Sequence, residues 1–509
     1  MPTEVELKLA VPPEALRALR QRLRQFGRPQ RQQTDSRYLD TADFRLARRQ
    51  AALRLRRSGR RWLQTFKTGE ALAALAARGE WETPAPGGRL HPQLLRDSPL
   101  AQLLGKRGMQ RLAPRFATRF LRETWQVERG EALIEVALDR GVVQTVDGTR
   151  TEPLLELELE LKRGEPAALL ALALELQGGA AQQAGDKVQS TRPGAEPELA
   201  LRPLPESKAA RGVRLAAGIS PAPAKANAEG FSECWHEDDS AAIALRAVAA
   251  HAADLVAANV GGALASDEPE FIHQARVALR RLRSALRMLG DGGDPFPADL
   301  GEELRWLARS LGAARDADVL LLETLPRMES AAGLTALQRR CLRAALQAER
   351  LRARAQARSA LASPRCSRLL LRLVQWSAST APAGPPLTAV APRLARRAQR
   401  RLAVQARLFA AQSAERRHRV RILAKRLRYA LDLLAPALPR KATAHQIERL
   451  AKLQDLLGTL NDARVAVAVC ARLLPGDALL LKLAAWERDG EARLLPQAER
   501  ALMRVLRGD

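Results

Sequence analysis

The sequence is poor in aromatic residues, in cysteine and in long apolar runs. Aromatic residues make up 4% of the 509 residues, and the four cysteines form no Cys-x-x-Cys pair. Such scattered cysteines are typical of reduced thiols in a cytosolic protein. No run of about 18 apolar residues and no N-terminal signal pattern occur, so we expect no membrane span and a cytoplasmic location.

Acidic residues are also scarce relative to basic ones. The chain has 83 Lys and Arg against 56 Asp and Glu, which gives a net charge of +27. This excess predicts a polyanionic partner: nucleic acid, an acidic membrane surface or a phosphate chain. A chain of 509 residues is too long for one core, so we expect two or three domains.

The first 217 residues mix strand and helix patterns. Residues 178–198 are rich in Gly, Ala, Gln and Pro and predict a flexible insertion. Helices are expected at 13–26, 91–105 and 166–176. Strands are expected at 4–8, 31–40, 52–58, 62–68, 78–83, 116–128, 132–146, 154–162 and 198–204.

The first of these strands, Glu4-Val5-Glu6-Leu7-Lys8, alternates charged and apolar residues. Alternate residues of a strand share a face, so Glu4, Glu6 and Lys8 point the same way. The pattern returns in Glu156–Lys162. Two such strands predict a shared acidic wall that faces something cationic, and a solvent-exposed strand is the alternative.

The pair Asp147-Gly148 separates two strand patterns and predicts a two-residue type I′ turn, with Val146 opposite Thr149. Like charges directly opposite each other destabilise a sheet unless something neutralises them. Metal ions or basic side chains are therefore expected beside this hairpin. The register gathers five carboxylates on one face, as the opposed pairs Glu135–Glu160 and Asp139–Glu156 with Glu158 between them.

Basic residues in the same half match this acidic set. Arg54 and Arg56 alternate on one strand, and Lys67 ends the next. Inward-pointing acids and bases together predict a closed barrel with a polar interior. A sheet with one polar face in solvent is the alternative. Four further arginines are spaced so that some must share a face: Arg37, Arg115, Arg119 and Arg122.

Six motifs occur in the order seen in the CYTH family, also called the triphosphate tunnel metalloenzymes, which residues 1–217 resemble. They are Glu4–Lys8, Tyr38–Thr41, Leu53–Arg56, Thr65–Lys67, Glu156–Lys162 and Ser207–Gly212. The resemblance implies an α+β domain with an eight-stranded antiparallel β tunnel, which binds a triphosphate together with Mg²⁺ or Mn²⁺.

The resemblance also implies roles for single residues. The implied metal ligands are Glu4, Glu6, Asp139, Glu156 and Glu158, which form the candidate catalytic set together with Lys8. The implied phosphate-binding residues are Lys8, Arg54, Arg56, Lys67, Arg122 and Lys208, to which we add Arg37 and Arg211 as candidates. Mg²⁺ and Mn²⁺ prefer oxygen ligands, and a triphosphate needs Arg and Lys to offset its charge. We expect in-line attack of a metal-associated water on the terminal phosphorus, without a single identifiable general base.

Beyond a linker expected at residues 218–235, helical periodicity runs to the C-terminus. The stretch His273–Arg283 recurs as His418–Arg428, which indicates an internal repeat over about 240–376 and 390–505. On a helix, His273, Arg276, Arg280 and Arg283 fall within a sector of roughly 80°, opposite an apolar face. In the second copy, the corresponding residues are His418, Arg421, Lys425 and Arg428, and we call these two sets the basic stripes. Ordinary amphipathic helices are the alternative.

These two basic stripes resemble the CHAD family, over about residues 236–505. The resemblance implies an all-α domain of two pseudo-symmetric helical halves that binds inorganic polyphosphate between them and does not imply catalysis. For the two histidines, hydrogen bonding to phosphate is favoured over metal binding. The candidate polyphosphate-binding residues are His273, Arg276, Arg280, Arg281, Arg283, His418, Arg421, Lys425, Arg426 and Arg428.

The hypothesis is therefore a metal-dependent hydrolase of inorganic triphosphate with a second domain, 236–509, that binds long-chain inorganic polyphosphate. One alternative is a non-catalytic polyphosphate-binding or targeting protein. Another is a nucleotide-acting tunnel enzyme, such as an adenylyl cyclase or a nucleoside or thiamine triphosphatase. No membrane partner is expected, and nucleic acid is disfavoured because stacking aromatic residues are few.

Overall fold

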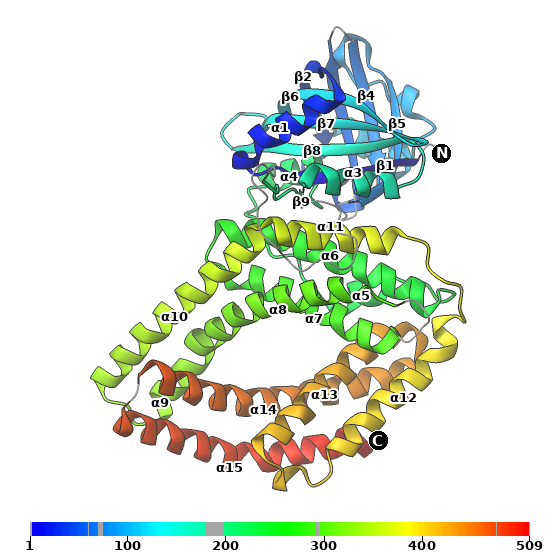
Figure 1. The fold of residues 1–509 in the computed structure, drawn as a ribbon. Coiled ribbons are helices and arrows are strands. Elements are labelled where there is room, and N and C mark those ends of the chain that lie inside the picture. Colours follow the sequence, from blue (N-terminus) through cyan, green and yellow to red (C-terminus); the bar gives the residue numbers. More distant parts are fainter. Residues whose placement is uncertain are drawn as a thin grey trace. The chain divides into compact units, whose positions relative to one another are not determined.

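The computed structural model describes residues 3–59, 61–69, 75–178, 197–290, 295–474 and 476–507 (Figure 1). The chain divides into two compact units. The first unit comprises Met1–Ala224, Ala253–Ser266 and Ala362–Ser379, and the second comprises Lys225–Ala252, Asp267–Leu361 and Thr380–Asp509. The division expected at residues 217 and 236 differs from these units, because two helical segments from the second half belong to the first unit.

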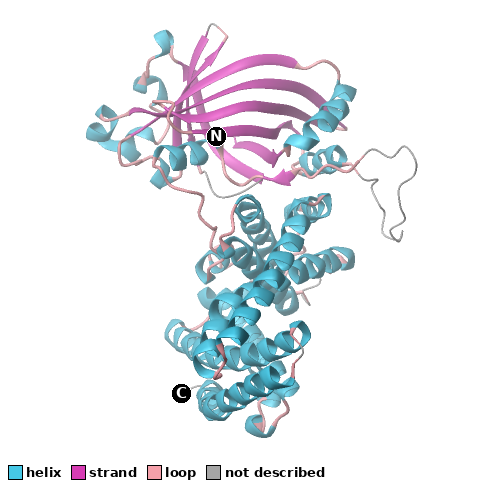
Figure 2. Ribbon diagram, turned by 90° about the vertical axis from the view of Figure 1, so that its left-hand side faces the viewer, coloured by secondary structure: helices cyan, strands magenta, loops and turns pink. Residues whose placement is uncertain are grey.

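The first unit is built on an antiparallel sheet, drawn in magenta in Figure 2. The strand order is β5-β4-β3-β2-β6-β7-β8-β1-β9, and β1 pairs with β5 as well as with β8. The eight longer strands therefore surround a cavity, and β9 adds two residues beside β1. The strands are β1 (Thr3–Ala10), β2 (Gln30–Asp40), β3 (Ala51–Ser58), β4 (Arg61–Thr68), β5 (Leu75–Pro84), β6 (Ala113–Arg129), β7 (Ala132–Thr145), β8 (Thr151–Arg163) and β9 (Arg202–Pro203).

Apolar residues pack on the outer faces of these strands, and polar residues point into the cavity. Leu7 and Leu9 of β1 are fully buried on the outside, while Glu6 and Lys8 are buried on the inside. Phe66 of β4 belongs to an apolar cluster that includes residues of α2. The helices of this part are α1 (Leu16–Leu23), α2 (Leu100–Gln110), α3 (Ala167–Gln177) and α4 (Lys208–Ala216). The expected insertion at 178–198 lies almost entirely outside the described residues.

The hairpin of β7 and β8 has the predicted register but not the predicted turn. Asp139 lies opposite Glu156, and Glu135 lies opposite Glu160. The last pair is formed by Thr145, whose amide donates to the carbonyl of Arg150 over 3.0 Å, so the loop has four residues instead of two. A four-residue loop centred on the same Asp147-Gly148 pair leaves the register unchanged. The register shifts only at the far end of the hairpin, between Leu133 and Ile134.

The second unit is helical, and two core clusters hold its long helices together. One cluster joins α12, α13, α14 and α15, and the other joins α9, α10, α14 and α15. The helices beyond the sheet are α5 (Ala228–Ser232), α6 (Ala241–Ala265), α7 (Pro269–Leu289), α8 (Ala298–Val319), α9 (Leu325–Ala331), α10 (Ala336–Ala362), α11 (Pro364–Ala378), α12 (Leu387–Gln405), α13 (Ala414–Leu434), α14 (Arg440–Leu473) and α15 (Asp477–Arg507). Of these, α11 and the second half of α6 belong to the first unit.

The second part of the expected linker is packed. It contains α5, where Phe231 is buried, and Trp235 is buried as well. The Trp235 indole donates to the carbonyl of Leu433 over 3.2 Å, within the second unit. The stretch expected as a linker, 218–235, is therefore packed after about residue 226, because these two aromatic side chains are buried.

Among the described residues, one helix, α6, has the length and apolar composition of a membrane span, and 61% of its apolar window is buried within the protein. The four cysteines are free thiols.

Candidate functional site: a charged cavity and two facing basic helices

The strand-lined cavity of the first unit has a volume of about 760 Å³. Side chains from all eight longer strands and from α4 reach it. Charged residues of both signs dominate the lining, as the alternation along the strands predicted. Among them are Glu6, Lys8, Arg54, Arg56, Lys67, Glu80, Glu82, Arg122, Glu135, Glu158, Glu160 and Lys208.

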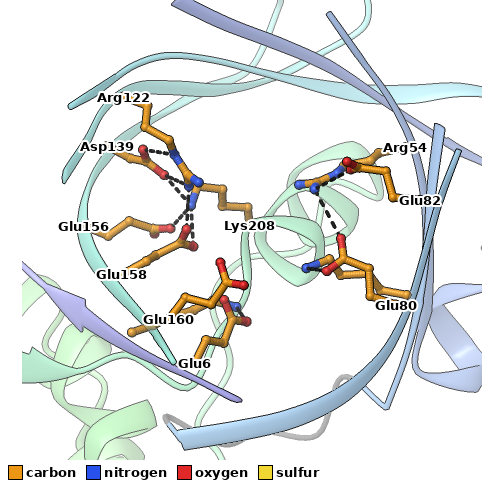
Figure 3. A network of polar contacts seen from close by, with 12 residues as sticks. Glu6, Arg54, Glu80, Glu82, Arg122, Asp139, Glu156, Glu158, Glu160 and Lys208 are labelled. Carbon is orange, nitrogen blue, oxygen red and sulfur yellow. Dashed lines mark hydrogen bonds and ion pairs between the residues drawn. The ribbon is translucent and has the colours of Figure 1, made fainter. Parts of the chain in front are cut away.

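One wall of the cavity holds three carboxylates, from Asp139 of β7 and from Glu156 and Glu158 of β8 (Figure 3). One oxygen from each lies within 4.8 Å of the others, a separation that allows all three to hold one metal ion. The β7–β8 register brings them together, because Asp139 and Glu156 are directly opposite and Glu158 is two residues along the same face.

Two cations neutralise this acidic wall. Arg122 of β6 donates two hydrogen bonds to Asp139, of 2.8 and 2.6 Å, and one of 2.5 Å to Glu158. The Lys208 ammonium, on the first turn of α4, lies 2.8 Å from Asp139 and 2.7 Å from Glu158 and also contacts Glu156. The Ser207 hydroxyl caps this helix by accepting from the Ala210 amide.

The electrostatics of the wall follow from these pairs. Burial lowers the pKa of Lys208, but the carboxylates of Asp139 and Glu156 outweigh it, and the net pKa lies above the ordinary value for lysine. Burial raises the pKa of Glu158, but Lys208 and then Arg122 outweigh it, and that pKa lies well below its ordinary value. Both groups are therefore charged at neutral pH.

A second acidic pair, on β5, lies across the cavity among the predicted phosphate-binding cations (Figure 3). Glu82 lies 3.0 Å from Arg56 and 3.9 Å from Arg54, and Glu80 lies 3.2 Å from Lys67. The Nε atoms of Arg54 and Arg56 are buried and make no hydrogen bond within the described part of the chain. Glu80 and Glu82 were not predicted as site residues, although the Gly79-Glu80-Trp81-Glu82 alternation carries the same signal as β1.

On β1, Lys8 forms a 2.8 Å ion pair with Glu6, and both side chains are buried in the cavity wall. The Glu4 side chain lies outside the described residues. Glu160, which the hairpin argument placed on this face, also lines the cavity and pairs with Lys162 over 2.5 Å.

Two of the candidate substrate-binding arginines lie elsewhere. Arg37 points away from the cavity, is exposed, and places its guanidinium 5.9 Å from the centre of the Trp62 ring. Its neighbours Ser36 and Tyr38 line the cavity together with Thr34, so the structure does not bring Arg37 into the cavity. Arg211 is buried one turn after Lys208 and lies 3.6 Å from Glu156, behind the acidic wall.

The residues of the acidic wall fit a divalent metal ion. Carboxylate oxygens are the ligands that Mg²⁺ and Mn²⁺ prefer, and three of them converge here. The Lys208 ammonium, in contact with all three, shows that the wall accommodates a positive charge at that point.

In the second unit, α7 and α13 contact each other and carry the two predicted basic stripes. Arg276 and Arg280 of α7 lie close enough to Lys425 of α13 for their positive charges to lower its pKa. The charge of Arg276 also lowers the pKa of Arg421. Burial, and then the positive charge of Arg421, lowers the pKa of Lys425 to about 7. The two copies of the repeat therefore bring their cations to one place.

Few acidic groups compensate these stripes. Asp316 lies 3.5 Å from Arg276, and the negative charge of Asp462 acts on Arg421. Buried nitrogens of His273 (Nδ1), Arg280 (Nε) and Arg421 (Nε) make no hydrogen bond within the described residues.

His418 lines a pocket of about 310 Å³, and its Nδ1 lies 2.9 Å from the Asn461 side-chain oxygen. Asn461 was not predicted as a contact of the stripe. No carboxylate or Cys cluster of metal-binding spacing surrounds either stripe histidine within the described residues.

Two candidate residues of the stripes serve other purposes. Arg281 is buried, lies 3.1 Å from Asp432, donates to the carbonyl of Ala226, and lies over the Phe231 and Tyr429 rings. It links α7 to α13 and α5, so the structure places it in the packing between these helices and not on the exposed basic surface. Arg426 is exposed and lines a different groove, between α12 and α13. Arg428 remains beside the stripes, with its guanidinium 5.9 Å from the Tyr429 ring centre.

Comparison with known proteins finds two family matches along the chain. Residues 2–191 match the family described as CYTH domain, and residues 246–471 match the family described as CHAD domain. An inorganic triphosphatase from Haemophilus influenzae is 33% identical over 170 residues, which are 32% of this chain and 46% of that protein. The chain thus aligns with about half the length of this relative.

Solved structures with similarity include the CHAD domain from the plant Ricinus communis, at 30% identity and a TM-score of 0.49, covering 56% of this chain and 97% of that one. Another is PptA from Streptomyces chartreusis, at 21% identity and a TM-score of 0.39, covering 52% of this chain and 97% of that one.

Proposed function

The chain carries a CYTH domain followed by a CHAD domain, and we propose that it hydrolyses inorganic triphosphate in the strand-lined cavity and binds inorganic polyphosphate on its basic helices. The observation that carries the first part is the joint presence of an acidic wall and a cationic wall in one cavity. A metal ion and a phosphate chain need these two walls, respectively. The related triphosphatase supports the same reaction class.

In this proposal, Asp139, Glu156 and Glu158 hold the metal ion, Mg²⁺ or Mn²⁺. When bound, the metal would offset the charge of the phosphate chain and favour ionisation of water. Glu6 extends the acidic wall on β1, and Glu4 is its expected partner.

The remaining charged residues bind and orient the substrate. Arg54, Arg56 and Lys67 contact the phosphates of the substrate, and these contacts replace their ion pairs with Glu80 and Glu82. Arg122 and Lys208 contact the substrate from the opposite wall. Phosphoryl transfer depends mainly on such positioning and on charge stabilisation, and these side chains are already held in place by ion pairs.

A nucleoside triphosphate is the second candidate substrate. Tyr38 and Phe120 line the cavity and offer aromatic surface to a base. Both rings have partners, because Tyr38 stacks on Phe116 at 4.5 Å and Phe120 faces Arg122 and Lys208. We therefore favour the bare phosphate chain.

The test is phosphate release from tripolyphosphate and from ATP, each with Mg²⁺ and with Mn²⁺. We expect faster release from tripolyphosphate, and loss of release in Glu4→Ala and Glu6→Ala. Absence of release by the wild type, or unchanged release by both variants, would contradict the hydrolase; faster release from ATP would favour the nucleotide enzyme.

We infer the second activity, polyphosphate binding, from the stripes. Arg276, Arg280, Arg421 and Lys425 converge with few acidic neighbours, and buried nitrogens of this group make no hydrogen bond to other described residues. An anion with many oxygens would satisfy these donors. A cytoplasmic location, where such phosphate chains would meet the protein, is part of this proposal.

A further inference from the structure

A second strongly basic surface of the second unit lies in a groove between α12 and α13. The groove has a volume of about 1520 Å³. Nine arginines line it, among them Arg393, Arg396, Arg400 and Arg401 of α12 and Arg419 and Arg426 of α13. No acidic and no aromatic residue of the described chain lines it. We call it the arginine groove.

The sequence explains why the arginine groove is so basic. Arg393, Arg396, Arg400 and their neighbours follow a spacing of three and four residues, so one face of α12 is basic over about 12 Å of helix. Between Glu349 and Glu415 the chain has thirteen arginines and no Asp or Glu. The arginines of α12 that line the groove are exposed, and Arg396 and Arg400 form no ion pair with any described residue.

The arginine groove uses a different face of α13 from the stripe. Arg419 and Arg426 lie more than a quarter-turn around the helix from Arg421 and Lys425, which belong to the stripe. Neither the CHAD-type repeat nor the stripe pattern therefore accounts for it. A uniform row of like charges destabilises the free protein, so an anionic ligand is the natural reason for it.

The arginine groove continues toward the α7 stripe. A small cavity of about 110 Å³ lies beside it and is lined by Arg287 of α7 together with Arg401 and Arg426. Arg287 follows Arg283, the last residue of the α7 stripe, by one helical turn. After burial, the charges of Arg287 and Arg401 are the causes that lower the pKa of Arg426, which agrees with their closeness.

The chemistry of the lining selects among polyanions. Guanidinium groups match phosphate oxygens in paired hydrogen bonds, and neighbouring arginines suit a ligand with closely repeated charges. Single-stranded nucleic acid binds through aromatic stacking as well as charge, and the described lining offers no aromatic side chain. An amphipathic helix binds a membrane through an apolar face as well as through charge, and the apolar lining of the groove is limited to Val404, Ile422 and Leu423.

We propose that the arginine groove is a second binding site for linear polyphosphate, which holds a part of a long chain beyond the part on the stripes. This proposal rests on the proposed function for its ligand, polyphosphate. It uses other residues than the stripes, so the assignment of the groove and the assignment of the stripes can each be disproved separately. Short chains occupy the stripes only, and long chains occupy both surfaces.

The test compares two triple variants of the full chain with equal change in charge. The groove variant is Arg396→Glu, Arg400→Glu and Arg419→Glu, and a second set with Gln at the same positions covers the case that reversal impairs folding. The control variant reverses three exposed arginines on α10 and α15: Arg339, Arg340 and Arg488. Circular dichroism melting verifies that each variant is folded.

Affinity is measured by titration with polyphosphate of about ten and about one hundred phosphates, with single-stranded DNA and with anionic vesicles. We expect the groove variant to lose on the order of tenfold affinity for the long chain and much less for the short chain, with a weaker salt dependence. The control variant should retain the wild-type affinity for both chain lengths.

Equal long-chain affinity of the groove and control variants would overturn the proposal. So would loss of DNA or vesicle binding by the groove variant with polyphosphate binding intact. Reversal of Arg276, Arg280, Arg421 and Lys425 separates the two assignments. If the stripe variant binds long chains as the wild type does, the proposed role of the stripes is contradicted and the proposal for the arginine groove stands. If the stripe variant keeps residual long-chain binding and the groove substitutions then remove it, both proposals are supported.

Discussion

The two charged regions of the molecule balance their charges in opposite ways. In the strand-lined cavity, carboxylates surround Lys208 and hold its pKa above the ordinary value despite burial. On the facing stripes, burial and neighbouring cations lower the pKa of Lys425 to about 7. The cavity can thus accept a cation and an anion together, whereas the stripes can accept an anion alone. This difference agrees with the proposed metal-dependent reaction in the cavity and the proposed polyanion binding on the stripes.

The largest expected effect is on the acidic wall. Asp139→Asn or Glu158→Gln should lower phosphate release from tripolyphosphate on the order of 10²–10³-fold, because a proposed metal ligand and the partner of Arg122 are lost together. Release is measured with Mg²⁺ and Mn²⁺, and Glu128→Gln on an exposed position of β6 is the control. Polyphosphate binding should stay at the wild-type level. Hydrolysis close to the wild-type rate in both variants would remove these residues from the site.

Charge reversal on the stripes should have the next largest effect. Changing Arg276, Arg280, Arg421 and Lys425 to Glu should weaken short-chain polyphosphate binding by at least about 100-fold, because several charge-assisted hydrogen bonds are lost. Tripolyphosphate hydrolysis in the cavity should continue. The matched control reverses four exposed arginines: Arg339, Arg340, Arg488 and Arg500. If the stripe and control variants bind equally, the stripes are only solvated helix faces.

A smaller effect concerns pH. Since the pKa of Lys425 in the free protein is about 7, the side chain is charged below pH 7 and neutral above it. A bound polyanion favours the charged form, so binding takes up a proton and the affinity falls as pH rises, by about tenfold from pH 6 to pH 8. The affinity is measured by titration calorimetry for the wild type and for Lys425→Met. The difference between the two pH profiles removes the contribution from ionisation of the polyphosphate itself. Identical pH profiles of the two proteins would show that Lys425 does not titrate in this range.

The smallest expected effect is at Arg37. Because its side chain lies on the outer face of β2, Arg37→Ala should change tripolyphosphate hydrolysis by less than about twofold. Arg56→Ala, inside the cavity, should raise the KM strongly. A large loss of activity in Arg37→Ala, at an unchanged melting temperature, would return this residue to the site.

Many of the residues that line the cavity could be predicted from the alternation of charged and apolar residues along the strands. The pattern of β1 and the register around Asp147-Gly148 correctly brought Asp139 and Glu156 together, because a loop of two or four residues with one centre gives one register. Arg37 could not be placed this way. Polar residues occupy successive positions of β2 from Gln30 to Arg37, so the sequence does not say which face is inside.

Helical periodicity predicted the two stripes but not the use of each arginine. Arg281 lies at the border of the stripe. Its side chain is directed into the packing by Asp432, its ion-pair partner, which is 151 positions away in the sequence. The internal repeat also did not predict the arginine groove, because the groove depends on the packing of α12 against α13. Contacts between distant helices decide such cases, and periodicity describes one helix at a time.

The most direct test of the division between the two regions is tripolyphosphate hydrolysis by two variants measured side by side with Mn²⁺. One variant is Asp139→Asn in the cavity, and the other is the fourfold reversal of the stripes. We expect the cavity variant to be nearly inactive and the stripe variant to hydrolyse tripolyphosphate near the wild-type rate. Equal loss in both variants, or activity retained in Asp139→Asn, would contradict this expectation.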